Sequence, residues 1–126
     1  MIGQTSGIEK SAKCTAAVAA FTIAKPGADD DTFSTATAVS EELIGVFQHA
    51  TTSANEEVRL MLTGITRIKL GGTVTRGGWA TTDGSGQGVA AAPSADVNNA
   101  VIGKFLASGV VGDIVTLLLA PGRIQG

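Results

Sequence analysis

The sequence predicts an all-β fold, a small single-domain β-barrel or β-sandwich with an extended N-terminal arm and at most one or two short helices. The 126 residues provide enough chain for one hydrophobic core but not for two. Seventeen residues are glycine and only 4% are aromatic, a composition that favours short strands joined by tight turns over a helical bundle. One hairpin pattern also occurs twice, which predicts a fold built from related halves.

The repeated pattern is clearest in Val101–Leu119, where two apolar runs flank a glycine-containing loop, as in a β-hairpin. Leu43–Leu62 repeats it. Ile-Gly-x-Phe recurs 58 positions later (Ile44 to Ile102), and we match the second strand at an offset of 56 (Val58 to Ile114). Two copies predict one barrel or sandwich made of related halves, because a solenoid needs three or more repeats.

The first third of the chain predicts an arm followed by strands. Met1–Lys13 is polar, contains two glycines and has no clear periodicity, so we expect a flexible arm. Cys14–Ala24 predicts a strand, with a short Ala-rich helix as the alternative, and the turn at Pro26-Gly27 ends it. Phe33–Val39 is rich in threonine and predicts another strand.

The remainder continues the β pattern. Thr63–Thr75 alternates between apolar and polar residues, with a bulge expected near Arg67. Asp83-Gly84 suits a hairpin turn that needs positive φ, and Pro121–Gly126 predicts a tail because proline cannot donate to a central ladder. The predicted organisation is an arm (residues 1–13) and a β-domain (14–126) that contains two hairpin units (43–62 and 101–119).

Charge and cysteine content exclude several function classes. The net charge is −2, with −7 concentrated in residues 28–57, so we expect no nucleic-acid partner, because such proteins carry a basic stripe. The single Cys14 and single His49 form neither an internal disulfide nor a metal cluster. The apolar run Cys14–Ala24 is too short to span a bilayer, and the charges before it begin too far from Met1 for a secretory signal.

No motif predicts catalysis or a cofactor. Arg76-Gly77-Gly78 lacks the Lys-Ser/Thr ending of a nucleotide loop, and the glycines over residues 84–88 have the wrong spacing for a dinucleotide fingerprint. His49 is the only imidazole, and the adjacent carboxylates Glu41-Glu42 point to opposite faces of an extended strand. We therefore expect no enzymatic activity and no cofactor.

Taken in order, several motifs resemble the small capsid decoration (cement) proteins of tailed bacteriophages. The resemblance covers roughly Ala36–Pro121 and leaves out Met1–Lys13. Its motifs are Leu43-Ile44-Gly45-Val46, Glu57-Val58, Gly64, Gly77-Gly78, Asp83-Gly84, Val101-Ile102-Gly103, Ala107-Ser108-Gly109 and Gly112-Asp113-Ile114-Val115. Trp79 and Lys104 depart from the pattern.

The resemblance implies a structural role on the outside of a phage capsid in the virion, after assembly in the bacterial host cytoplasm. The implied partners are the major capsid protein, whose subunits it would bridge, and further copies of the chain, with a homotrimer favoured. We expect the contacts to involve the arm and an aromatic/Arg pair, since such residues are enriched at interfaces, although Trp79 could instead belong to the core. The candidate contact residues are Ile2, Ile8, Lys10, Lys13, Arg76 and Trp79.

Three rival functions stay open at this point. The first is another virion component, such as a tail or head–tail connector subunit. The second is a small trimeric β-barrel nucleotide hydrolase, which would need converging Asp, Ser and aromatic residues. The third is a carbohydrate-binding module, for which one Trp and no Tyr provide little surface for sugar stacking.

Overall fold

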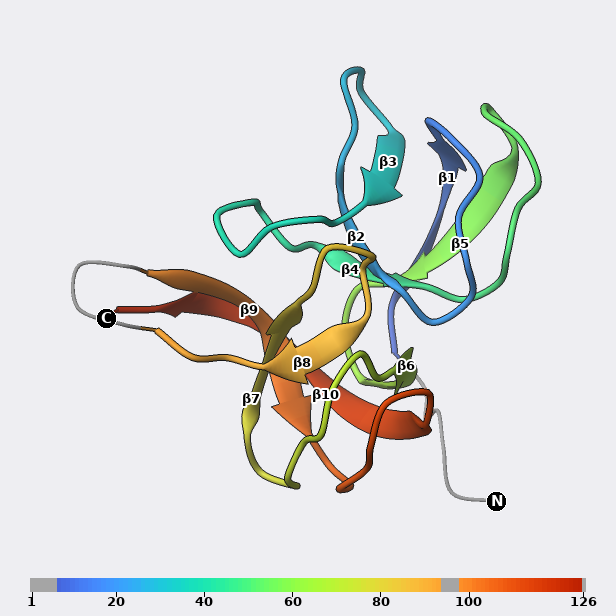
Figure 1. Cartoon of the computed structure of the whole chain (residues 1–126). Coiled ribbons are helices and arrows are strands. Elements are labelled where there is room, and N and C mark those ends of the chain that lie inside the picture. Colours follow the sequence, from blue (N-terminus) through green and yellow to red (C-terminus); the bar gives the residue numbers. More distant parts are fainter. Residues whose placement is uncertain (1–6, 94–97, 126) are drawn as a thin grey trace.

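The computed structural model describes residues 7–93 and 98–125 and confirms the all-β prediction (Figure 1). This part of the chain contains ten strands and no helix. The strands are β1 (Glu9–Cys14), β2 (Ile23–Pro26), β3 (Thr32–Thr35), β4 (Gly45–Phe47), β5 (Glu57–Met61), β6 (Ile65–Lys69), β7 (Trp79–Thr82), β8 (Gly88–Ala90), β9 (Asn99–Phe105) and β10 (Ile114–Ile124).

The strands form two sheets, one from each half of the chain. We call residues 7–62 the first half and residues 63–125 the second half. The first half forms a closed barrel in the order β1-β3-β2-β4-β5, and the second forms a five-stranded sheet in the order β6-β10-β9-β7-β8. In Figure 1 the barrel strands β1, β3 and β5 lie above the second sheet. Each half therefore pairs its strands internally, and the small all-β domain consists of a closed barrel and a second sheet.

The two sheets share one strand order and one register. Strands β1, β5, β4, β2 and β3 correspond to β6, β10, β9, β7 and β8, and equivalent residues are separated by 55 to 58 positions. Corresponding cross-strand pairs are Lys13–Glu57 with Lys69–Ile114, Phe47–Leu60 with Phe105–Leu117, Ile23–Val46 with Trp79–Lys104, and Ala24–Thr35 with Ala80–Ala90. The equivalence thus spans all ten strands and not only the two hairpins.

Unusual backbone conformations are also equivalent between the halves. Phe21, Asp31 and Asn55 have positive φ, a region that side chains other than glycine rarely adopt. At the three equivalent positions the second half has Gly77, Gly86 and Gly112, also with positive φ. The loops therefore turn at corresponding places, even where the sequences differ.

Each half has its own interior, built from equivalent positions. In the first half, buried side chains from β1, β2, β4 and β5 and from the loop before β2 fill the barrel, and the partly buried Phe33 of β3 packs against them. These positions and their counterparts, every one of them buried, are Ala12/Ile68, Cys14/Leu70, Val18/Val74, Ala24/Ala80, Phe47/Phe105, Val58/Val115 and Leu60/Leu117. The second half carries the larger side chain at the first two of these positions.

The halves differ in how the sheet closes. In the first half β1 pairs in parallel with β3, and the Lys13 N–H donates to the Asp31 carbonyl at 3.1 Å. In the second half only the bridge Leu70–Gly88 remains, and the Lys69 N–H donates instead to the Phe21 carbonyl at 2.9 Å. The loop before β2 therefore lies where β6 and β8 would pair if the second sheet closed as the first does. We call this place the seam of the second half, and the equivalent place between β1 and β3 the seam of the first half.

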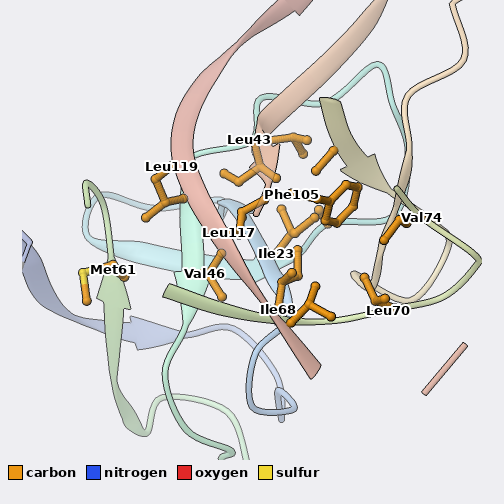
Figure 2. Packing of buried hydrophobic residues seen from close by; sticks show 14 of the residues in the cluster. Ile23, Leu43, Val46, Met61, Ile68, Leu70, Val74, Phe105, Leu117 and Leu119 are labelled. Atoms are coloured by element: carbon orange, nitrogen blue, oxygen red, sulfur yellow. The ribbon is translucent and has the colours of Figure 1, made fainter. Parts of the chain in front are cut away.

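The hydrophobic cluster of the second half includes residues of the first. Ile23, Val46 and Met61 are fully or almost fully buried in this cluster. Figure 2 shows Ile23 beside Leu117 and Ile68 of the second sheet. Because these side chains alternate with the barrel interior along their strands, they lie on the outer face of the first barrel. The outer face of the first half thus completes the hydrophobic cluster of the second half.

Two predictions for the N-terminal third are wrong. Residues 9–13 of the predicted arm belong to strand β1, which pairs with β5 over Glu9–Lys13 and directs Ala12 into the barrel. The predicted strand Cys14–Ala24 is mainly a loop between β1 and β2, since the positive φ of Phe21 interrupts extended backbone. The part of the predicted arm before Gly7 lies outside the described residues.

Several later predictions also need correction. The hairpin at Asp83-Gly84 exists, but its positive φ is at Gly86. Strand β6 pairs with β10 without a bulge near Arg67. Strand β10 continues beyond Pro121, which is tolerated because the β6 pairing ends at Leu118 and the β9 register shifts between Leu119 and Gly122.

The offset of the second hairpin strand also changes. Pairing and burial align Val58 with Val115, at 57 positions, instead of with Ile114. Val58 and Val115 both point into the interior, whereas Ile114 is 51% exposed. A one-residue slip would exchange the two faces of the strand.

Candidate interaction surface

The outer face of the first barrel is covered by the second half. Ile23, Val46 and Met61 lie side by side on β2, β4 and β5, because Val46 pairs with both of the others. The Ile23 N–H donates to the Gly86 carbonyl at 2.8 Å, and the Gln48 side chain donates to the Thr66 hydroxyl at 3.0 Å. This contact therefore combines apolar burial with hydrogen bonds.

The equivalent face of the second half is exposed. Trp79, Lys104 and Leu118 occupy the corresponding positions on β7, β9 and β10, and Lys104 pairs with both of the others. Trp79 is 39% exposed and Leu118 is 41% exposed. The Lys104 Nζ lies 4.8 Å from the centroid of the Trp79 ring, a cation–π contact. We call these three residues the exposed stripe.

Further exposed apolar side chains adjoin the stripe. Leu106 follows β9 on the same face as Lys104, and Ile114 lies four residues before Leu118 on β10. Val110 and Val111, in the loop that precedes β10, are 54% and 66% exposed. Exposed apolar residues gathered on one face make that face a candidate interaction surface. The equivalent first-half residues are Gln48, Ser53, Ala54 and Glu57, so this character belongs to the second half alone.

The first half carries a hollow of about 500 Å³ at its barrel seam. It lies between β1 and the loop that joins β2 to β3. Its lining residues are Lys10, Ser11, Ala12, Lys13, Asp30, Asp31, Thr32 and Glu57. Lys10 and Asp31 form an ion pair across it at 3.0 Å. The hollow is therefore polar, unlike the exposed stripe.

Two carboxylates, Glu41 and Glu56, have lowered pKa values, and hydrogen bonds within loops contribute to both. Burial raises the pKa of Glu41, but the Lys25 ammonium and the backbone N–H groups of Thr37 and Ala38 outweigh it and hold that pKa at about 2. Hydrogen bonds from Thr52 and Ser53 lower the pKa of Glu56. Both carboxylates cap loops beside a strand.

The described residues contain no group of three or more metal-ligating side chains close enough to hold an ion. Cys14 is buried in the first barrel, and its Sγ lies 3.3 Å from the Thr51 hydroxyl. The His49 Nε2 accepts the Arg59 N–H at 3.2 Å. In the same part of the chain, no helix is long and apolar enough to cross a membrane.

The predicted contact residues fall into two groups. Lys10 and Lys13 line the hollow of the first half, whereas Arg76 and Trp79 lie at the entrance to β7 in the second half, both exposed. Ile8 is 62% exposed immediately before β1, and Ile2 lies outside the described residues. The partial exposure of Trp79 rules out its alternative role in the core.

The sequence reading missed Lys104, Leu118 and the acidic side of the hollow. A signal for Leu118 was present, since Ile114, Thr116 and Leu118 alternate with buried Val115 and Leu117 along β10. The position of Asp30 and Asp31 beside β1 depends on the parallel β1–β3 pairing, for which the local sequence has no signal.

Comparison with known proteins finds a similar fold in a phage protein. No family model matches the chain, and a search of curated proteins finds no match. Among solved structures, the chain is similar to the head fiber gp8.5 N base of bacteriophage phi29, with a TM-score of 0.70 and 18% sequence identity. The match covers 94% of this chain and 98% of the other, so the two share their fold over almost their full lengths.

Proposed function

We propose that this protein is a structural component of a phage virion that binds the outer surface of the capsid and stabilises it by bridging subunits of the major capsid protein. The observation that carries the proposal is the full-length similarity of fold to the phi29 head fiber base. The sequence motifs independently resemble capsid decoration proteins. Both lines of support point to the phage head.

The surface chemistry suits a binding role. The second half exposes an apolar face centred on Trp79 and Leu118, and aromatic residues beside cations are frequent anchors of interfaces. Many identical sites on a shell would provide avidity to an oligomer that contacts several subunits at once. We therefore propose a homo-oligomer, with a trimer favoured, on the exterior of the capsid.

We also propose that the protein is not an enzyme. The two carboxylates with lowered pKa values are held by loop hydrogen bonds and by Lys25. Titration with nucleoside triphosphates tests this, and hydrolysis above the buffer rate would contradict it.

A second candidate function is favoured by the same structural similarity. In this role the chain serves as the attachment base of a longer capsid fibre, as its structural neighbour is the base of a head fiber. Imaging of virions distinguishes the two roles: a decoration protein contributes a compact bump, whereas a fibre base carries a projecting shaft.

The direct test mixes the purified protein with capsid shells that lack it and measures co-sedimentation and shell resistance to heat. We expect saturable binding and a higher disruption temperature. Absence of binding to the matching shells would overturn the proposal. Removing residues 1–6 leaves β1 intact and tests the predicted arm, whereas deletion to residue 13 would remove a barrel strand.

A further inference from the structure

The contact between the two halves shows how one outer face is covered within this chain. The corner Phe21–Ile23 of the first half enters the seam of the second half. Its Phe21 carbonyl accepts the Lys69 N–H, and its Ile23 N–H donates to the Gly86 carbonyl. The corner thus lies between the end of β6 and the loop that joins β7 to β8. Val46 and Met61 extend the buried face beside it.

The equivalent corner of the second half is Gly77–Trp79, together with Lys104 and Leu118. Gly77 repeats the positive φ of Phe21, and its N–H donates to the Phe105 carbonyl as that of Phe21 does to Phe47. The corner therefore has the same backbone shape as the buried one. Its Trp79 and Leu118 side chains are exposed and Lys104 is half-buried, so the described part of the chain does not cover this corner as it covers the first.

The seam that would receive such a corner also exists twice. In the second half it is formed by β6 and the β7–β8 loop, and the first half fills it. The equivalent elements of the first half are β1 and the β2–β3 loop, and these line the 500 Å³ hollow. The hydrogen bond from Lys13 to Asp31 keeps this seam closed at the backbone, so a guest would contact the side chains that line the hollow.

The charges of the two surfaces are complementary. Residues 1–62 contain four Lys or Arg and eight Asp or Glu, a net −4, whereas residues 63–126 contain five and three, a net +2. Locally, Arg76 and Lys104 belong to the exposed corner, whereas the hollow is lined by three carboxylates, Asp30, Asp31 and Glu57, and by two lysines, of which Lys10 is paired with Asp31. Opposite charges steer the second half of one copy toward the first half of another and disfavour contacts between like halves.

We propose that the exposed corner of one copy, Arg76–Trp79 with Lys104 and Leu118, docks on the hollow of a second copy, at the place equivalent to the seam that the first half fills within the chain, and contacts the side chains that line the hollow. Such a head-to-tail interface forms a closed ring when its rotation closes. A ring of three copies would contain six equivalent halves. This inference deepens the oligomeric part of the proposed function and does not depend on capsid binding.

The test measures the molar mass of the purified full chain by light scattering after size exclusion, over a range of protein and salt concentrations. We expect a mass of three copies that dissociates as salt rises, since the contact pairs opposite charges. A corner variant, Trp79→Ala combined with Lys104→Ala, and a hollow variant, Asp30→Lys, should each weaken association by about tenfold or more. The control Gly84→Ala, at an exposed turn residue that belongs to neither surface, should keep the wild-type mass.

A mixture of the two variants makes the test specific for a head-to-tail contact. The hollow variant retains an intact corner, and the corner variant retains an intact hollow, so we expect a 1:1 dimer that neither variant forms alone. Circular dichroism should show that each variant keeps the wild-type fold. A monomeric wild type, or oligomers that survive both variants, would overturn the inference. Variants that are monomeric but still bind shells would show that capsid binding does not require the contact between copies, so the two proposals can be tested separately.

Discussion

The two halves share one strand order and register, but only the outer face of the first half is covered by the other half. Ile23, Val46 and Met61 of the first half are buried under the second half, whereas Trp79, Lys104 and Leu118 at the equivalent positions meet solvent. When two equivalent units pack through different surfaces, as these halves do, one copy of each surface has no partner within the chain. The side chains have diverged accordingly, since a fully apolar set remains where the face is covered and a lysine interrupts it where the face is open.

The halves also differ in how their interiors are completed. The first barrel closes on itself through β1 and β3. The second needs Ile23 and its neighbours to complete its hydrophobic cluster. The first half is therefore structurally self-contained, and the second depends on the contact between the halves.

Equivalent substitutions on the two outer faces should have very different effects on stability. Ile23→Ala removes a fully buried side chain from the cluster of the second half and should lower the free energy of unfolding by about 2–5 kcal/mol. Trp79→Ala removes a side chain that is 39% exposed and should cost about 1 kcal/mol or less. Urea unfolding followed by circular dichroism measures both.

Similar costs for these two variants would contradict the comparison, since Trp79 would then be as deeply packed as Ile23. The control is Leu106→Ala, an exposed residue on the same face as Lys104. Its unfolding midpoint should stay close to that of the wild type.

The glycines of the two Ile-Gly motifs should both be intolerant of substitution, because each lies against the backbone of its own hairpin partner. A Cβ at Gly103 would overlap the Leu118 carbonyl oxygen, and one at Gly45 would lie 2.5 Å from the Met61 carbonyl oxygen. Gly103→Ala should destabilise by about 3 kcal/mol, at the upper end of the usual range for overpacking, and Gly45→Ala by less. Thermal unfolding of both variants checks the order.

Gly84→Ala is the matched control for this pair, because a Cβ there meets no atom within 4 Å. Its melting temperature should be unchanged within the error of the measurement. A tolerated Gly103→Ala would mean that β9 and β10 can separate at this point.

The sequence was sufficient for the fold class and for the two hairpins, because alternation and glycine turns are local signals. It was insufficient for the complete duplication. Lys13 and Lys69 are among the few identical residues at equivalent strand positions outside the hairpins, and loops of different length shift the offset from 55 to 58. What the halves share is backbone register and burial, and these are properties of pairing that one strand does not specify.

The residues of the exposed stripe and of the hollow were predicted in part for the same reason. Trp79 is recognisable by residue type, and Lys10 and Lys13 by their charge. Whether such a residue lies on an open or a covered face depends on the packing of the halves. Ile23 and Trp79 occupy equivalent places, and only the fold determines which of them is buried.

The positive-φ positions offer a finer comparison. Gly112 has φ of +90° with free space around a Cβ, and its counterpart Asn55 has φ of +66°. Gly112→Ala should therefore cost about 1–2 kcal/mol through backbone strain alone. Gly112→Asn should cost less than Gly112→Ala, because asparagine tolerates this region better. Equal costs in thermal unfolding would show that the loop relaxes.

The smallest expected effect is a pH dependence confined to the first half. The pKa of Glu41 is about 2 in the folded protein, below the 4.5 of an unperturbed glutamate, because Lys25 and two backbone N–H groups outweigh the effect of burial. A carboxyl with a lowered pKa stabilises the fold above its unfolded pKa, and this contribution is lost as pH falls from about 4.5 toward 2. Since both partners are partly exposed, the loss should be on the order of 1–2 kcal/mol.

In the second half the counterpart of Lys25 is Thr81, which donates to the Ala100 carbonyl at 2.7 Å and carries no charge. Hydrogen exchange at pH 5 and pH 3, corrected for intrinsic rates, should therefore show protection falling more in β2 than in β7. Glu41→Gln should abolish the difference, whereas Glu42→Gln, whose residue pairs with Arg123 at the exposed surface, should preserve it. An equal fall in both strands would show instead that acid weakens the whole protein together.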